Sequence, residues 1–134
     1  MRISGFLYVI GLLVLTGWAI SGFAADTTGK ESTRTCLPLN TIDNLDIIDE
    51  QHIAFQMRND DYYLNELPHT CPTLNHNRAI MYSTPLSSLC SLDIITVLDS
   101  IGGGFQFMGS CGLGKFRPAT KEEIQLMKDN KSGK

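Results

Sequence analysis

His52-Ile53-Ala54-Phe55-Gln56-Met57-Arg58 alternates in polarity, which places Ile53, Phe55 and Met57 on one face of an extended strand. The next three residues, Asn59-Asp60-Asp61, have the composition of a tight turn. Tyr62-Tyr63-Leu64-Asn65-Glu66-Leu67 then returns as a second strand. This stretch predicts a β-hairpin and, with it, a mostly β fold.

Further strands are predicted on the C-terminal side of this hairpin. Residues 78–83 form one candidate, and residues 93–99 are apolar on both faces, which is typical of a central strand. Gly102-Gly103-Gly104 turns the chain into a strand at 105–108, and a short strand is expected near 45–49. Short strands separated by turns predict a small antiparallel sandwich or barrel.

One helix is expected at the end of the chain. Thr120-Lys121-Glu122-Glu123 has the capping-box pattern, in which the threonine hydroxyl accepts from the third helical N–H. Ile124, Leu126 and Met127 supply a small apolar face. We expect a single domain over residues 36–128, followed by a polar tail at 129–134.

The N-terminal segment predicts export. No charged residue lies between Arg2 and Asp26, and a short apolar run there ends in small residues up to Ala24. This pattern is typical of a secretory signal peptide over residues 1–24, with a flexible polar leader at 25–35. We therefore expect a periplasmic or secreted protein; the alternative is a retained N-terminal membrane anchor with the domain facing the periplasm.

Length and charge exclude several classes of protein. The chain of 134 residues allows one domain and excludes a barrel enzyme or a doubly wound nucleotide-binding fold. Its formal net charge of −3 leaves no basic excess for binding nucleic acid.

Four cysteines follow the proposed signal peptide, an even number that predicts two disulfides in an exported domain. We expect Cys71–Cys90 across a loop and Cys36–Cys111 between the two ends of the domain. A hairpin formed by residues 93–99 and 105–111 would instead bring Cys90 close to Cys111.

Two patterns resemble ligand sites but lack the chemistry. Gly109-Ser110-Cys111-Gly112-Leu113-Gly114-Lys115 has the spacing of a phosphate-binding loop, but Phe116 replaces the magnesium-binding hydroxyl and Pro118 blocks the following helix. A zinc set drawn from His69, Cys71, His76 and Cys90 matches no standard spacing and competes with disulfide formation. We expect no metal and no cofactor.

Catalytic alternatives rest on two groups of residues. Cys111 could act as a thiol nucleophile with a histidine base, for which His52, His69 and His76 are available. The acidic group Asp43, Asp46, Asp49 and Glu50 could perform acid–base chemistry if burial separated their pKa values. A solvated acidic edge explains the second group more simply, and we assign no catalytic residue.

Six aromatic residues could include a binding face, although about half of them are needed for the core. They are Phe55, Tyr62, Tyr63, Tyr82, Phe105 and Phe107.

The arrangement of the cysteines and of the helix cap resembles a known family. Cys36, Cys71-Pro72, Leu89-Cys90 and Cys111 come in order, followed by Phe116-Arg117-Pro118 and the capped helix. The chain in this respect is similar to a family of small exported bacterial proteins known only as a domain of unknown function. The resemblance implies an envelope location and disulfides, and it supplies no catalytic residues.

By elimination, the sequence favours a non-enzymatic exported domain that binds a protein or another envelope component. Two alternatives remain. One is a small hydrolase or thiol enzyme, and the other is an inhibitor of an envelope-degrading enzyme.

Overall fold

The computed structural model describes residues 32–133, and the predicted signal peptide at 1–24 lies outside them. The described chain is mostly β with one C-terminal α-helix, as predicted. Its elements are β1 (Cys36–Pro38), the 3-10 turn η1 (Leu39–Thr41), β2 (Ile42–Ile47), β3 (His52–Met57), β4 (Tyr62–Glu66), β5 (Ala79–Tyr82), β6 (Ser88–Cys90), β7 (Ile94–Ile101), β8 (Gly104–Gly112), β9 (Phe116–Ala119) and α1 (Lys121–Ser132).

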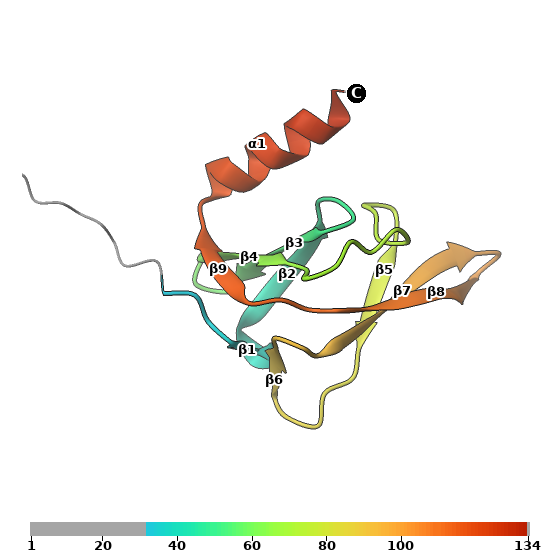
Figure 1. The fold of residues 1–134 in the computed structure, drawn as a ribbon, viewed down its shortest axis with the longest axis horizontal. Coiled ribbons are helices and arrows are strands. Elements are labelled where there is room, and N and C mark those ends of the chain that lie inside the picture. Colours follow the sequence, from blue (N-terminus) through green and yellow to red (C-terminus); the bar gives the residue numbers. More distant parts are fainter. Residues whose placement is uncertain (1–31, 134) are drawn as a thin grey trace, which may run out of the picture.

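The strands form three antiparallel sheets. The largest has the order β2-β3-β4-β9, a second has the order β5-β7-β8, and β1 pairs with β6. In Figure 1 helix α1 lies over the four-stranded sheet at the top, and the β7–β8 hairpin extends away from the body to the right. The predicted central position of residues 93–99 is confirmed, because β7 lies between β5 and β8.

The predicted hairpin is the centre of the four-stranded sheet. Phe55 of β3 lies opposite Tyr63 of β4, and the turn between the strands contains Asp60 with a φ of 64°. Both faces of this sheet are buried. Phe55 and Ile53 face the main core, whereas Ala54 packs under α1 in a second, smaller cluster.

The main core fills the space between the four-stranded and three-stranded sheets. Phe55 and Phe116 meet edge to face with their ring centroids 5.4 Å apart, a favourable arrangement for two aromatic rings. The three-stranded sheet contributes Ile95 and Val97, both essentially inaccessible to solvent. This core therefore joins strands that are far apart in the sequence.

Strand β9 is an element that the sequence pattern does not reveal. It is four residues long and contains Pro118, which lies opposite Tyr63. Proline lacks an N–H group, so within sheets it occurs mainly on edge strands. β9 is the outer strand of its sheet, and the proline there is compatible with pairing on one side.

Helix α1 begins where the sequence predicts. The Thr120 hydroxyl accepts the Glu123 backbone N–H at 3.1 Å, and Ile124 is buried against the sheet. The expected apolar face is wrong at Leu126, whose side chain is 63% exposed. Two residues along a helix turn by about 200°, so Leu126 cannot share the face of Ile124. The helix continues to Ser132, through most of the predicted polar tail.

The two disulfides are Cys36–Cys90 and Cys71–Cys111, so the predicted pairing Cys71–Cys90 with Cys36–Cys111 is wrong. The reason is strand register. Cys36 and Cys90 are direct neighbours across the β1–β6 ladder, and Cys71 in the loop after β4 lies beside β8, which carries Cys111. The disulfides indicate an oxidising, extracytoplasmic compartment. Within the described residues, no helix is both long and apolar enough to cross a membrane.

Candidate functional site

A cleft of about 680 Å³ opens between two sheet edges and the C-terminal half of α1. β2 is the outer strand of the four-stranded sheet and β5 is the outer strand of the three-stranded sheet, so no ladder of hydrogen bonds closes the space between them. Lys128 and Lys131 of α1 line the remaining side. The cleft is thus a consequence of two sheets that share a core but not an edge.

The floor of the cleft is apolar. Ile42 and Leu45 from β2, Ile80 from β5 and the buried ring of Phe55 line it. The first three side chains are half-buried and pack against the main core. A ligand that covered them would remove further apolar surface from water, which favours binding of an apolar group.

Ion pairs surround this floor. Lys128 Nζ lies 2.7 Å from Asp46 Oδ2, and Lys131 Nζ lies 3.5 Å from Asp49 Oδ2. Arg78, which precedes β5, pairs with Asp99 of β7.

The lining of the cleft carries charges of both signs, and each of its cations is paired with a carboxylate. It includes three permanently charged cations, Arg78, Lys128 and Lys131, against two carboxylates, Asp43 and Asp46. The described chain as a whole has eight basic and twelve acidic side chains. The cations of the cleft are balanced by carboxylates, because Arg78 and Lys131 pair with Asp99 and Asp49, which lie just outside its lining.

Asp49 is the carboxylate with the most hydrogen bonds beside the cleft. It accepts the backbone N–H groups of Gln51 and His52 at 2.8 and 2.9 Å, and it lies 2.9 Å from the His52 Nδ1 atom. Burial by itself raises the pKa of Asp49, but the hydrogen bonds from Gln51 and His52 and the charges of His52 and Lys131 together lower it. A carboxyl group with a lowered pKa is held ionised and is poorly suited to donate a proton near neutral pH.

The structure does not gather the acidic group into a catalytic pair. Asp46 and Asp49 are paired with lysines of α1, and Asp43 and Glu50 are exposed. The predicted solvated acidic edge is therefore accurate for two of the four residues, while the other two attach the helix.

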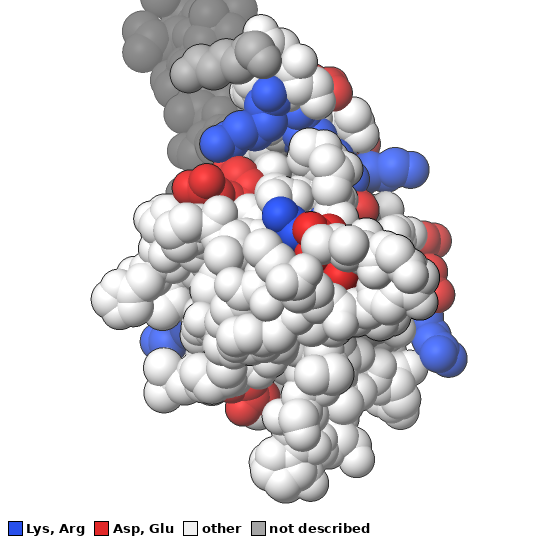
Figure 2. Space-filling view, turned by 90° about the vertical axis from the view of Figure 1, so that its right-hand side faces the viewer, with Lys and Arg blue, Asp and Glu red and all other residues white. Residues whose placement is uncertain are grey.

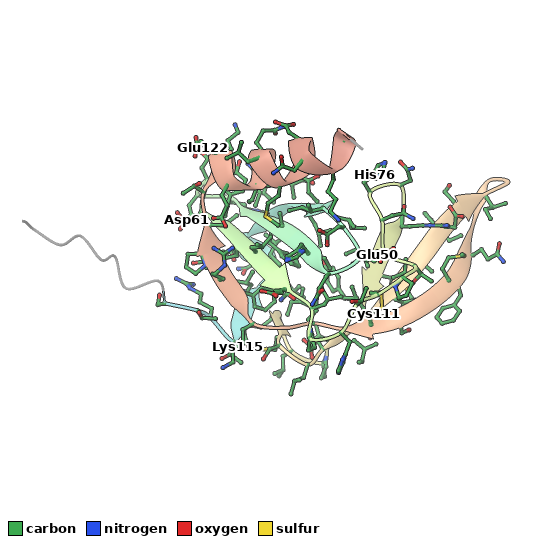
Figure 3. The ribbon with its side chains drawn as sticks, turned by 45° about the horizontal axis from the view of Figure 1, so that its top comes forward. Glu50, Asp61, His76, Cys111, Lys115 and Glu122 are labelled. Carbon is green, nitrogen blue, oxygen red and sulfur yellow. A yellow bond between two sulfur atoms is a disulfide. The ribbon has the colours of Figure 1, made fainter. Side chains whose placement is uncertain are left out.

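Cys111 and the histidines do not form a thiol site. Cys111 is bonded to Cys71 and carries no thiolate in this structure. His69 and His76 are exposed, and Figure 3 shows His76 well apart from Cys111. The zinc hypothesis fails on the same ground, because Cys71 and Cys90 belong to different disulfides. Across residues 32–133, no three His, Cys, Asp or Glu side chains come together as metal ligands.

The segment that resembles a phosphate-binding loop is extended. Gly109–Gly112 is part of β8, and the chain then runs on towards Lys115 rather than curling around a ligand (Figure 3).

Gly114 has a different role, which involves the buried Asn65. The Asn65 Nδ2 group donates to the Gly114 carbonyl at 2.7 Å, and the Gly114 N–H donates to Asn65 Oδ1 at 2.9 Å. A Cβ atom at position 114 would lie 1.9 Å from the Glu66 carbonyl oxygen.

The aromatic residues divide as expected between core and surface. Phe55 and Tyr63 are buried, whereas Tyr82, Phe105 and Phe107 are exposed. Figure 2 looks at the hairpin end of the molecule, whose surface is mostly uncharged apart from a small group of both charges near the centre and one acidic patch lower down.

The cations that line the cleft are not singled out by sequence reasoning. Lys128 and Lys131 are three residues apart in the helix, and Asp46 and Asp49 have the same separation near β2. This matched spacing of opposite charges is a signal that the sequence contains, but it does not show that α1 lies against the end of β2.

Comparison with known proteins gives one match. A family with the description "Family of unknown function (DUF6491)" matches residues 1–134. No curated protein and no solved structure matches the chain.

Proposed function

The chain belongs to this family of unknown function, which assigns it no activity, and we propose that it is an exported binding protein for an amphipathic organic acid. The ligand has an apolar body and an acidic head, and it occupies the cleft between β2, β5 and α1. The protein acts in the periplasm after removal of residues 1–24. The disulfides support an oxidising compartment for this role.

One observation carries the proposal, namely the combination of an apolar floor with three cations at its rim in an acidic protein. The half-buried Ile42, Leu45 and Ile80 offer contact to an apolar chain. Arg78, Lys128 and Lys131 offer charge-assisted hydrogen bonds to an anion at the rim. Their present partners are carboxylates, so the site already holds the kind of group that the ligand would present.

The size of the cleft is appropriate for such a molecule. Small-molecule sites have volumes of about 300–1,000 Å³ and combine an apolar lining with a few polar groups that fix orientation. The volume of about 680 Å³ lies in that range. A fatty acid of medium chain length represents this class of ligand.

The test is titration calorimetry with dodecanoate as the probe and dodecyltrimethylammonium as its cationic counterpart. We expect saturable binding of the acid and weaker binding of the cation. Lys131→Glu, at an exposed position on the rim, should weaken dodecanoate binding about 5-fold, which corresponds to an ion pair of about 1 kcal/mol. Lys121→Glu, at the other end of the same helix, is the matched control and should bind as the parent does.

Two results would overturn the proposal: absence of saturable binding, or equal weakening in both variants. The intact mass of the protein recovered from cells tests the export step separately. A mass that begins at Ala25 supports cleavage after Ala24, whereas an uncleaved mass supports the membrane-anchored alternative.

A further inference from the structure

The free edge of β8 is open over only part of its length. β8 is the outer strand of the order β5-β7-β8, so one side of its backbone has no neighbouring strand in the described chain. Near Gly109 the loop after β4 approaches, since a Cβ atom there would lie 3.3 Å from Thr73 Oγ1, and Cys111 is bonded to Cys71. The open part is therefore Gly104–Met108, in which Phe105 is 71% and Phe107 65% exposed.

This open segment lacks the usual protection of an edge strand. Natural edges are blocked by charges, prolines or a covering element, because an open edge pairs with other chains. The outer strand of the other sheet, β9, contains Arg117 and Pro118. β8 has neither a charged residue nor a proline, and its only irregularity is a register shift beside Met108, where the open part ends.

The charge distribution favours a second copy of this chain as the partner. Residues 79–114 contain only two charged side chains, Asp93 and Asp99, and each of them already has a partner. The rest of the described chain contains ten acidic and eight basic side chains. No charge on β8 itself therefore opposes its pairing with a second copy.

A lipid surface fits this edge less well. Open backbone N–H and C=O groups have no hydrogen-bond partners in hydrocarbon, so sheet edges do not insert there. The acidic excess of the protein also opposes binding to anionic lipids. An antiparallel strand from a second copy satisfies these backbone groups and meets no opposing charge.

We propose that Gly104–Met108 pairs antiparallel with the same segment of a second copy, with Gln106 on the two-fold axis. Any antiparallel pairing of a strand with itself is symmetric, which closes the assembly at two chains. With Gln106 opposite itself, Phe105 of each copy lies opposite Phe107 of the other copy on the same face. Cross-strand aromatic pairs of this kind stabilise a sheet.

The resulting dimer is weak and depends on concentration. The paired segment has five residues, and its contact is smaller than the roughly 800 Å² per partner of a stable complex. The cleft borders β5, at the other edge of the same sheet, and it stays open in the dimer. This proposal is independent of the ligand proposed above.

The test is sedimentation velocity of the purified, oxidised protein from about 10 µM to about 1 mM, a range that covers weak association. We expect the parent to shift from monomer to dimer across the series. Gln106→Lys places two like charges across the axis and should remain monomeric at every concentration. Ser100→Lys adds the same charge to the same hairpin on the central strand β7, and it should dimerise as the parent does.

Three results would overturn the proposal. They are a parent that stays monomeric, a Gln106→Lys variant that still dimerises, and equal loss of dimer in Ser100→Lys, which would place the contact on the sheet face instead. Flotation of a monomeric parent with phosphatidylcholine vesicles would identify a lipid partner and also overturn it. If Gln106→Lys does not fold, Gln106→Glu provides the same test, with dimerisation expected to recover as the pH falls below about 4.3.

Discussion

The two larger sheets of this protein differ in how they meet water. The four-stranded sheet is buried on both faces, between the main core and α1. The three-stranded sheet is buried on one face only, where Ile95 and Val97 lie, and its other side exposes Phe105 and Phe107.

The segment that contains the more exposed sheet has fewer charged side chains than the rest of the described chain. The segment that contains the three-stranded sheet, residues 79–114, has two charged side chains, while the remaining described residues have eighteen. A sheet with one solvated face normally alternates apolar and polar residues. The segment that forms this sheet is thus poor in charge although one of its faces is exposed, and the rest of the described chain supplies most of the charged surface.

The largest effect should come from loss of the Cys71–Cys111 disulfide, which ties the loop after β4 to β8. Replacing Cys71 and Cys111 by serine should lower the free energy of unfolding by about 4 kcal/mol, the loop-closure value for a separation of this size. The matched variant replaces Cys36 and Cys90, which pair in the outer β1–β6 ladder over 54 residues, against 40 for the first bridge.

Loop length alone predicts nearly equal losses for the two variants. Cys71 is buried in the core and Cys36 is exposed, so we expect the variant without Cys71 and Cys111 to lose more stability. Urea unfolding measures both. An equal or larger loss in the second variant would contradict a special role for the bridge between the sheets.

A smaller effect is expected where the chain passes from one sheet to the other. Gly114→Ala should destabilise the protein by about 3 kcal/mol, because the added Cβ atom meets the Glu66 carbonyl, which belongs to a paired strand and cannot move freely. Gly112→Ala is the control two residues away, where the nearest atom to a Cβ is Ile94 Cδ1 at 4.0 Å. Thermal unfolding should separate the two variants, and similar midpoints would contradict the close approach.

The smallest effect should be a pH dependence of stability that comes from Asp49, which lies beside the cleft and pairs with Lys131. The pKa of Asp49 is lowered in the folded protein, so its ionised form stabilises the fold above the ordinary value of 3.8, and this contribution is lost as the pH falls through the folded value. Asp49→Asn should therefore be less stable than the parent at pH 6 and approach it at low pH.

Asp43→Asn is the control for this prediction, because the Asp43 side chain is exposed. Urea midpoints measured from pH 6 down to pH 3 compare the variants. A constant difference between Asp49→Asn and the parent across this range would rule out the titration as its cause.

The sequence predicted the elements that have a local pattern. Alternation identified the β3–β4 hairpin, the apolar run identified β7 as central, and Thr120 marked the start of α1. β1 and β6 are three residues long and show no period, and Pro118 concealed β9. Local signals thus describe strands that make their own pattern and miss those that exist only through a partner.

The site could be predicted only in part, because it depends on the register and edges of separate sheets. The disulfide pairing follows from which strands become neighbours, and no local pattern contains that information. The cleft exists because β2 and β5 are both outer strands. The exposure of Phe105 and Phe107 depends on how far the hairpin extends beyond the core, which composition does not determine.

The paired hydrogen bonds of Asn65 and Gly114 have a consequence for how this chain changes over evolution. The two positions are 49 residues apart, and we expect replacement of either one to destabilise the fold. A side chain at 114 displaces the strand beside it, and loss of the amide at 65 leaves two buried backbone groups without partners. Divergent copies of this protein should therefore keep both residues, and their joint presence would distinguish descendants of this fold from chains that share only its cysteine spacing.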